Sequence, residues 1–154
     1  MTLNELVRLR TVADYQFGGG AGAALFPPDG DLTVTHSTGG RPRQIRTDAG
    51  RLVSYGTDGR FTLGVEGGRR LTEALDPPRA RVVVGAESEP FVREGKNAFA
   101  KFVTAVDGDV RPSDEVAVVN DDGDVLGVGR AELSANAMRD FGTGMAVKVR
   151  EGAD

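Results

Sequence analysis

RVVVG (81–85) and MAVKVR (145–150) are two alternating apolar runs that enclose the stretch of sequence on which the fold depends. Between them lie two further apolar runs, EVAVV (115–119) and VLGVGRAEL (125–133), separated by NDDGD (120–124). Short apolar runs bounded by Asp, Gly and Asn are typical of strands joined by tight turns. We therefore expect the second half of the chain to be a small, complete β-rich unit.

One segment of this unit has a different pattern. EPFVREGKNAFAKFV (89–103) is helix-like, and we interpret Phe91, Val92, Phe99 and Phe102 as core residues. The aspartates of NDDGD lack the ligand spacing and the distal glutamate of an EF-hand loop, so we interpret that segment as a hairpin turn.

The chain begins with helical patterns. Residues 3–14 place apolar side chains near helical spacing, with Thr2 or Asn4 as the cap, and AGAALF (21–26) predicts a second short helix. The glycines at 18–22 lack the lysine of a P-loop and the preceding strand of a dinucleotide fold. We interpret them as a tight joint between two helices, with four neighbouring side chains in the core: Tyr15, Phe17, Leu25 and Phe26.

From residue 31 onward, apolar and polar residues alternate, so the hydrophobic period changes to two. Four alternating runs follow one another: DLTVTHS (31–37), RQIRTD (43–48), RLVSYG (51–56) and RFTLG (60–64). Their short Gly-containing spacers predict an antiparallel meander. VEGGRRLTEALDPP (65–78) predicts a helix with Leu71, Ala74 and Leu75 on one face, ended by the two prolines. We therefore predict an α+β fold with two domains. Residues 1–78 form a four-stranded antiparallel sheet with helices, and residues 79–154 form the β-rich domain.

Composition excludes several classes of protein. With 154 residues, 22 glycines and no cysteine, the chain has no disulfide scaffold, no thiol nucleophile and no cysteine-based zinc site. No apolar run approaches the roughly 20 residues of a membrane helix, so we expect a cytoplasmic protein with no membrane partner. Residues 1–80 hold 10 arginines and 9 acidic residues, whereas residues 81–154 hold 9 basic and 14 acidic residues. The acidic second half argues against strong nucleic-acid binding without excluding a local basic surface.

Four arginines, Arg41, Arg43, Arg46 and Arg51, lie within eleven residues of the predicted meander. The planar guanidinium suits phosphate groups, so these residues are a candidate secondary RNA patch. A solvated surface paired with nearby aspartates explains them equally well. The only histidine, His36, has no metal-binding cluster around it, and we interpret it as a surface or hydrogen-bonding residue. The sequence predicts no catalytic residue, no metal site and no cofactor.

Three strings in the second half carry a family resemblance. RVVVGAESEPFVREGKNAFAKFV (81–103), VRPSDEV (110–116) and VGRAEL (128–133) resemble a PUA domain, the small RNA-binding β-barrel named for pseudouridine synthases and archaeosine transglycosylases. The resemblance covers residues 79–151 and implies a PUA-type β-barrel. Ser113 replaces a glycine that is common in the family's turn, and this change should alter only local geometry.

The first half is similar to a known companion of that domain. LRTVADYQFGGGAGAALFP (9–27) and EGGRRLTEALDPPRARVVV (66–84) resemble the accessory domain that precedes the PUA domain in archaeosine tRNA-guanine transglycosylases and archaeosine synthases. The resemblance is to the C-terminal portion of these much larger enzymes. Neither the catalytic barrel of the transglycosylases nor the cysteine motif of the synthases is found in this sequence.

The resemblance implies where RNA would bind. In PUA domains the RNA lies across the first helix, the glycine-containing loop after it and the edges of neighbouring strands. The resemblance implies that the corresponding RNA-binding positions in this sequence are Arg93, Gly95, Lys96, Asn97, Lys101, Gly129, Arg130, Lys148 and Arg150. All three lysines of the chain are among them.

Together these features predict a non-catalytic RNA-binding protein that recognises structured RNA such as tRNA in support of RNA modification. The resemblance implies a separately encoded tRNA-guanine transglycosylase or archaeosine synthase subunit as its partner. The alternative is a protein–protein docking module of an RNA-modification or ribosome-assembly complex, which the acidic second half favours. An enzyme acting alone is the least favoured interpretation, because the chain offers one isolated histidine and no paired carboxylates.

Overall fold

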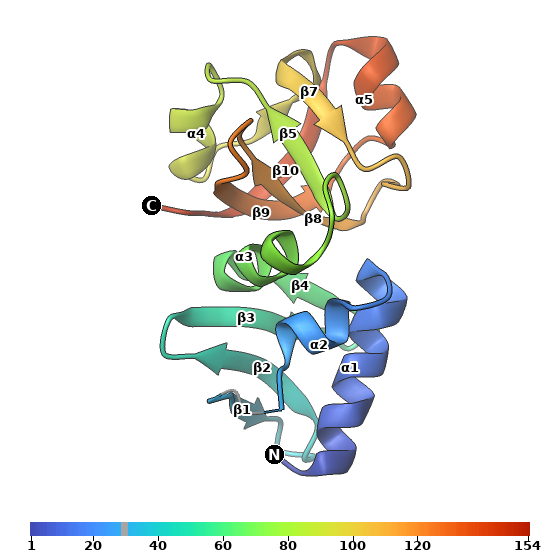
Figure 1. The fold of residues 1–154 in the computed structure, drawn as a ribbon, viewed down its shortest axis with the longest axis vertical. Helices are drawn as coiled ribbons and strands as arrows, with labels where there is room; N and C mark the ends of the chain where they lie inside the picture. The colour runs from blue at the N-terminus through green and yellow to red at the C-terminus, as the bar shows by residue number, and fades with distance from the viewer. Residues whose placement is uncertain (29–30) are drawn as a thin grey trace.

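A computed structural model describes residues 1–28 and 31–154 and shows two β-sheets stacked along the long axis, with one helix between them (Figure 1). The first sheet is antiparallel, in the order β1-β2-β3-β4. Its strands are β1 (Thr33–His36), β2 (Pro42–Thr47), β3 (Gly50–Tyr55) and β4 (Phe61–Leu63). The predicted meander is therefore confirmed.

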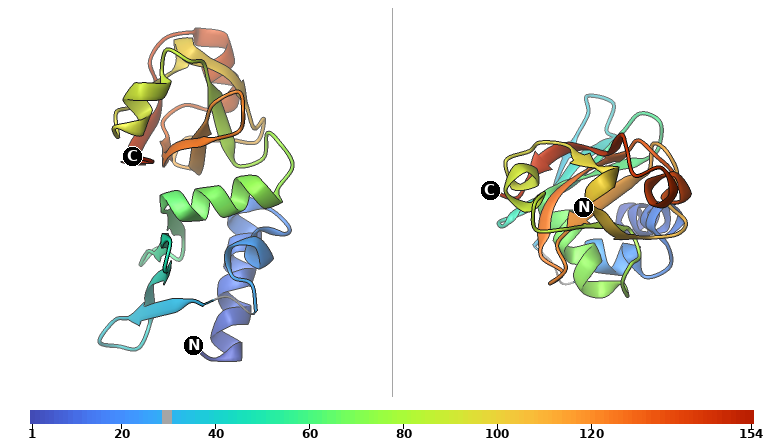
Figure 2. Two further views of the ribbon diagram at one scale, coloured as in Figure 1. Left: turned by 60° about the vertical axis from the view of Figure 1, so that its left-hand side comes forward. Right: turned by 90° about the horizontal axis from the view of Figure 1, so that it is seen from above.

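The second sheet has the order β6-β10-β9-β8-β5-β7 and curls into a nearly closed barrel (Figure 2). Its strands are β5 (Arg81–Val84), β6 (Ala98–Phe99), β7 (Val103–Val106), β8 (Glu115–Val119), β9 (Val125–Ala131) and β10 (Met145–Gly152). β5 pairs with β8 in parallel, and the other pairings are antiparallel. The predicted α+β class with a barrel in the second half is confirmed.

Helix α1 (Leu3–Phe17) begins at Thr2, whose hydroxyl accepts a hydrogen bond from the Glu5 amide at 3.1 Å. A cap of this kind satisfies one of the otherwise unpaired amides of the first turn. The helix buries Leu6, Leu9 and Ala13 against the first sheet. It extends three residues beyond the predicted segment.

The glycine-rich joint connects α1 to α2 (Ala21–Leu25). Gly18 and Gly20 have φ of 107° and 95°, which L side chains rarely adopt. A Cβ atom on Gly22 would collide with the backbone of Arg10, so the two helices pack in close contact only because residue 22 is glycine. The interpretation as a joint is confirmed, and Leu25 and Phe26 are fully buried. Phe17 is partly buried against the core, but the core prediction for Tyr15 is wrong, because its side chain leaves α1 on the solvent side and is 90% exposed.

Strand β8 is buried along its whole length because both of its faces are covered. Ala117 and Val119 pack into a core shared with the first half of the chain, whereas Val116 and Val118 pack inside the barrel. Successive side chains of a strand point to opposite faces, so a strand between two cores must be apolar at nearly every position. This explains why EVAVV lacks a polar face.

Helix α3 (Val65–Ala74) lies between the two sheets (Figure 2). Gly67 packs against the Leu52 carbonyl of β3, and Gly68 packs against the Val128 side chain of β9. Leu71 and Leu75 are buried as predicted, whereas Ala74, in the last turn, is exposed and its predicted position is wrong. The two adjacent glycines let one helix contact both halves of the molecule closely.

Two parts of the barrel differ from the prediction. Residues 89–103 form a short helix α4 (Glu89–Arg93), then β6 and a 3-10 turn η1 (Ala100–Phe102), rather than one helix-like piece. Helix α5 (Ala135–Phe141) was not predicted, although Ser134 caps it by accepting from the Ala137 amide. Each helix is too short for its apolar spacing to be recognised. In the described residues, no helix is long and apolar enough to cross a membrane.

Candidate nucleic-acid interface

The loop after α4 contains three of the residues implied by the family resemblance. The Gly95 amide donates to Val92 O at 2.9 Å, and the Lys96 amide donates to Phe91 O at 3.0 Å. Gly95 has a φ of 91°, which allows the chain to reverse at the end of the helix. Asn97 Oδ1 then accepts from the Val149 amide of β10 at 3.0 Å. The loop is thereby fixed to the barrel, so Gly95 and Asn97 have clear structural roles.

An apolar hollow of about 370 Å³ lies beside this loop. It is lined by Ser88, Phe91, Lys96, Asn97, Phe99, Lys101 and Phe102. The Lys96 ammonium lies 5.6 Å from the centre of the Phe91 ring, and the Lys101 ammonium lies 5.0 Å from that of Phe102. The chain thus places aromatic faces and positive charges around one surface. We call it the aromatic hollow.

Two of its phenylalanines correct the sequence interpretation. Phe91 and Phe99 are 51% and 45% exposed, so the prediction that they are core residues is wrong. Val92 is fully buried as predicted, and Phe102 is half-buried. The cause is local: α4 ends at Arg93, and Phe99 lies on the edge strand β6, where no further strand covers it. Exposed aromatic rings beside lysines are suited to stacking on unpaired bases.

Other implied residues lie outside the aromatic hollow. Arg130 and Lys148 are paired across β9 and β10, and both are exposed. The Arg130 guanidinium is 3.3 Å from Glu132 and lines a separate hollow of about 480 Å³ beside the β3–β4 turn. A Cβ atom on Gly129 would collide with the Lys148 carbonyl, so this glycine permits the close approach of β10. The Lys96 ammonium lies 3.5 Å from the Glu94 carboxylate, whereas in the described part of the chain no carboxylate lies within 4.0 Å of the Lys101 or Lys148 ammonium.

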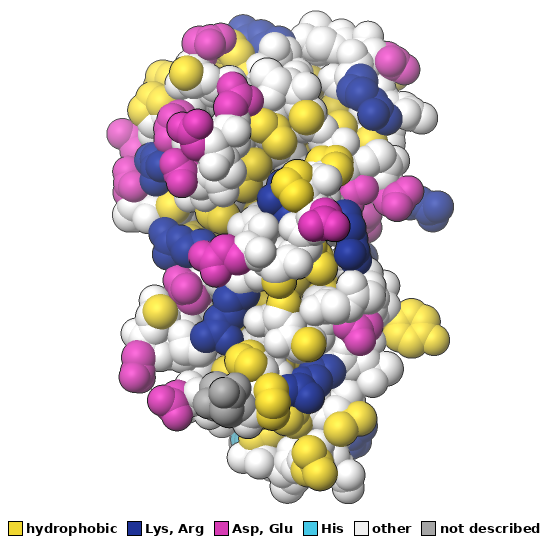
Figure 3. All heavy atoms as spheres, in the orientation of Figure 1, with side chains coloured by type: hydrophobic (Ala, Val, Ile, Leu, Met, Phe, Trp, Pro, Cys, Tyr) yellow, Lys and Arg dark blue, Asp and Glu magenta, His cyan; other side chains and the backbone are white. Residues whose placement is uncertain are grey.

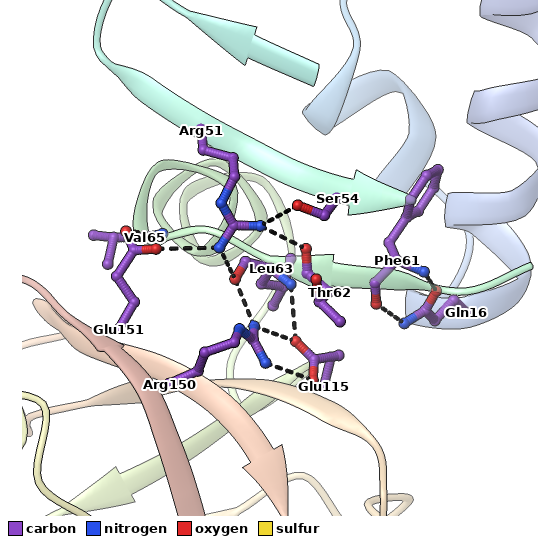
Figure 4. A network of polar contacts seen from close by, with 10 residues as sticks. All are labelled: Gln16, Arg51, Ser54, Phe61, Thr62, Leu63, Val65, Glu115, Arg150 and Glu151. Atoms are coloured by element: carbon purple, nitrogen blue, oxygen red, sulfur yellow. Dashed lines mark hydrogen bonds and ion pairs between the residues drawn. The ribbon is translucent and has the colours of Figure 1, made fainter. Parts of the chain in front are cut away.

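Two of the predicted arginines bind within the protein at the junction of the sheets (Figure 4). Arg150 contacts the buried Glu115 carboxylate at 2.6 and 3.1 Å and also donates to Leu63 O at 2.6 Å. Arg51 donates to Leu63 O at 3.1 Å and to Glu151 at 3.1 Å. Their guanidinium groups hold β4 and β10 together. A third arginine, Arg93, pairs with Glu89 at 3.0 Å and with Asp154 at 3.7 Å.

The four arginines of the meander do not form a single patch. Arg41 donates to Gly56 O at 3.0 Å and lies over the Tyr55 ring, and Arg51 belongs to the junction just described. Arg43 and Arg46 are exposed on β2. Only these two have side chains directed to solvent, which halves the charge that the secondary patch could present.

Titratable groups elsewhere serve structural contacts. Burial lowers the pKa of the Arg81 guanidinium, and the nearby carboxylates of Asp107 and Asp76 oppose that effect. Arg81 donates to Leu75 O at 2.7 Å and so ties α3 to β5. His36 lies 3.1 Å from the Glu5 carboxylate at the surface, in agreement with its interpretation as a hydrogen-bonding residue. Among the described residues, no group of three His, Cys, Asp or Glu side chains could hold a metal ion.

Comparison with known proteins identifies two domain families in the chain. Residues 7–78 match the patch-forming domain C2 of tRNA-guanine transglycosylase, and residues 80–153 match the PUA domain. The tRNA-guanine(15) transglycosylase of Pyrococcus furiosus is 43% identical over 152 residues, which are 98% of this chain and 25% of that enzyme. The chain therefore spans about a quarter of the length of this curated relative, and it corresponds to the C-terminal portion.

Two solved structures share the fold over nearly the whole chain. A hypothetical protein of Pyrococcus horikoshii OT3 has a TM-score of 0.73 at 20% identity, covering 99% of this chain and 92% of that one. A conserved PUA domain protein from Thermoplasma acidophilum has a TM-score of 0.67 at 20% identity, covering 99% and 91%. These likenesses concern the fold alone. The family resemblance inferred from the sequence is confirmed by the domain matches.

Proposed function

We propose that the chain is a non-catalytic RNA-binding protein that binds tRNA, because it matches the patch-forming domain C2 and the PUA domain and so corresponds to the C-terminal portion of tRNA-guanine transglycosylases. The observation that carries the proposal is the aromatic hollow, where the exposed Phe91 and Phe99 line one surface together with Lys96 and Lys101. Proteins bind unpaired RNA by stacking its bases on aromatic rings and by placing basic side chains against its phosphates.

The net charge of the second half does not exclude this function. RNA affinity depends on the charge at the contact surface rather than on the sum over the chain. Two of the three lysines line the aromatic hollow, and the third lies on β10 of the same barrel. The contacts would be few, so binding should be moderate and should fall only gradually with salt, because the slope scales with the number of phosphates neutralised.

We assign the chain a supporting role in tRNA modification, in the cytoplasm, together with a separately encoded tRNA-guanine transglycosylase or archaeosine synthase. The chain matches only about a quarter of the transglycosylase from Pyrococcus furiosus, so the remaining part of such an enzyme would supply the chemistry. Arg130 and Lys148 lie outside the aromatic hollow, and their exposed side chains would extend the RNA contact along the barrel.

The experiment is an anisotropy titration of the full chain with labelled tRNA over a range of salt concentrations. Affinity should fall linearly with salt on logarithmic axes, with a slope set by the number of phosphates bound. The double substitution Lys96→Ala/Lys101→Ala should weaken binding about tenfold and reduce the slope by about two, one for each phosphate that is no longer neutralised. Absence of binding at low ionic strength, or binding that is independent of salt, would contradict the proposal.

A matched control is available on the same barrel. Arg139 is exposed on α5, which lies across the barrel from α4 (Figure 1). Arg139→Ala removes one positive charge without touching the aromatic hollow. Its affinity for tRNA should stay within about twofold of the unchanged chain, since a distant exposed charge is largely screened. An equal loss of affinity per charge removed in the two variants would show that only net charge matters.

The second candidate function is docking to a protein of an RNA-modification or ribosome-assembly complex. The exposed apolar residues Leu3, Val7 and Tyr15 of α1 favour it, because they face solvent in the described structure. Pull-down of the tagged chain before and after RNase treatment separates the two functions. Partners that persist after RNase digestion indicate protein docking, whereas partners that disappear indicate binding through RNA.

A further inference from the structure

We propose that Asn97 makes the aromatic hollow selective for an unpaired base that carries a carbonyl oxygen, and that it excludes adenine. This inference rests on the proposed function, because it concerns which base of the bound RNA enters the hollow. The side chain of Asn97 contacts β10, and the same residue lines the hollow. Its amide therefore has one end bound within the protein and the other available to a ligand.

The orientation of the Asn97 amide is fixed by its contact with β10. The Val149 backbone amide can only donate a hydrogen bond, so the atom that faces it at 3.0 Å must be the oxygen Oδ1. Strand β6 begins at Ala98, which pairs with Val147 of β10. The backbone of β6 does not continue opposite Val149, and the Asn97 side chain supplies the acceptor instead. A rotated amide would place two donors against each other.

The nitrogen of the same amide, Nδ2, carries two N–H donors and no acceptor. Within the described residues, Nδ2 of Asn97 donates no hydrogen bond of 3.5 Å or less. It is also not buried, because among those residues the only buried side-chain nitrogen or oxygen without a partner belongs to Arg10. Asn97 is half-buried and lines the hollow, so we place the accessible Nδ2 at the wall of the hollow.

The hollow has the size and the surroundings for one base. Its volume of about 370 Å³ lies at the low end of small-ligand pockets, which span roughly 300–1,000 Å³. Phe91 and Phe99 offer apolar faces on which a base stacks, and Lys96 and Lys101 offer positive charge for the adjoining phosphates. Figure 3 shows hydrophobic side chains at the surface of the barrel on the side where Figure 1 places α4. A flat aromatic group on an anionic chain matches this combination.

A fixed donor on the wall separates adenine from the other three bases. Guanine, cytosine and uracil each carry a carbonyl oxygen, which accepts a hydrogen bond from an amide nitrogen. Adenine has none, and its ring nitrogens N1 and N7 both neighbour the N6 amino group, which is itself a donor. Asparagine normally reads adenine with both ends of its amide, at N6 and N7. Because Oδ1 of Asn97 is turned toward Val149, only Nδ2 would face the base, and it would oppose the adenine amino group.

The test measures binding of short RNAs to the full chain by anisotropy at low ionic strength. One probe is an RNA of about nine nucleotides with adenine at every position, and four others carry guanine, cytosine, uracil or hypoxanthine at the central position. Hypoxanthine is adenine with the amino group replaced by a carbonyl oxygen, so this probe isolates the carbonyl contact. Each of the four should bind about fivefold more tightly than the all-adenine RNA, which is the effect of one added hydrogen bond.

Asn97→Asp changes the donor alone, because aspartate keeps an oxygen for the Val149 amide and replaces Nδ2 by a second acceptor. The added negative charge should weaken binding of every RNA, so the readout is the ratio of the hypoxanthine affinity to the adenine affinity. This ratio should fall from about five to about one or below. Lys101→Ala is the matched control: it should weaken all the RNAs alike and leave the ratio unchanged. Urea unfolding should give both variants the midpoint of the unchanged chain.

Equal affinity of the unchanged chain for all five RNAs would overturn the inference, and so would an unchanged ratio in Asn97→Asp. Titration with tRNA separates these results from failure of the proposed function. If tRNA binds but none of the short RNAs does, the selectivity of the hollow is rejected and the proposed function stands. If neither tRNA nor the short RNAs bind, both are rejected.

Discussion

Phe91 leaves half of its side chain exposed although its neighbour Val92 is fully buried. An exposed phenylalanine contributes little to folding, so Phe91→Ala should change the free energy of unfolding by less than about 0.5 kcal/mol. If its ring stacks on a base, the same change should weaken binding of single-stranded RNA by about 1–3 kcal/mol. Urea unfolding and anisotropy titration measure the two effects. A large loss of stability with unchanged RNA affinity would assign Phe91 to packing.

For Arg150 we expect a loss of stability, because its guanidinium is bound to Glu115, which is almost completely buried. Arg150→Ala would leave that carboxylate with the Leu63 amide as its remaining partner at 2.8 Å. An uncompensated buried charge should lower the free energy of unfolding by about 2–3 kcal/mol. Urea unfolding measures it, with Arg130→Ala as the control, because the exposed pair of Arg130 with Glu132 is worth at most about 1 kcal/mol. Equal stability of the two variants would contradict the assignment.

The contrast between these residues shows what the sequence could and could not predict about the site. The family resemblance placed Lys96, Asn97 and Lys101 on one surface, and the structure brings them together. It could not separate Arg150 from Lys148, two residues apart on β10, because their difference depends on a carboxylate 35 positions earlier in the chain. Residues two apart on a strand lie on the same face, so the alternating pattern could not separate these two side chains.

Helix α3 carries a prediction at the scale of the element. Replacing glycine by alanine inside a helix normally stabilises it by about 1 kcal/mol. At Gly67 the added Cβ would collide with the Leu52 carbonyl, which belongs to a strand and cannot rotate away. Overpacking of this kind costs about 1–3 kcal/mol, so Gly67→Ala should destabilise the protein.

The control for Gly67 is Glu73→Ala on the exposed side of the same helix. It raises helix propensity without adding volume at the packed face, so the free energy of unfolding should stay within about 0.5 kcal/mol. Denaturant titration measures both variants. Stabilisation by Gly67→Ala would show that α3 can shift away from β3 without cost.

Elements were predictable where a periodic pattern had sufficient length. The meander, α1 and four strands of the barrel, β5, β8, β9 and β10, follow from their own spacing, whereas β6 and β7 were not predicted. Helix α5 was missed because it has seven residues, of which Ala135 and Met138 are buried, too few to define a period. Residues 89–103 were interpreted as one helix-like piece because the turn at Gly95 and the short strand β6 leave no alternating run. Short elements are set by the surface onto which they pack.

The two halves share one continuous core at the scale of the whole molecule. Ala117, Val119, Val125 and Val128 of the barrel pack with the apolar residues of the first half, and α3 lies between them. Polar contacts strengthen the same junction: Arg150 of β10 binds Leu63 of β4, and Arg51 of β3 binds Glu151 of β10 (Figure 4). Arg81 of β5 binds Leu75 at the end of α3. Domain pairs normally move relative to each other unless their interface is large and apolar. The junction in this chain is apolar because buried residues of β8 and β9 belong to the core of the first half.

We therefore expect the full chain to unfold as one cooperative unit. Both tyrosines lie in the first half, and the chain has no tryptophan, so tyrosine fluorescence in urea reports on that half. Amide signals of β10 in NMR spectra report on the barrel. A single cooperative transition requires the same midpoint by both probes, and Arg150→Ala should lower both midpoints together. A tyrosine transition at lower urea than the loss of the β10 signals would show that the two halves unfold separately.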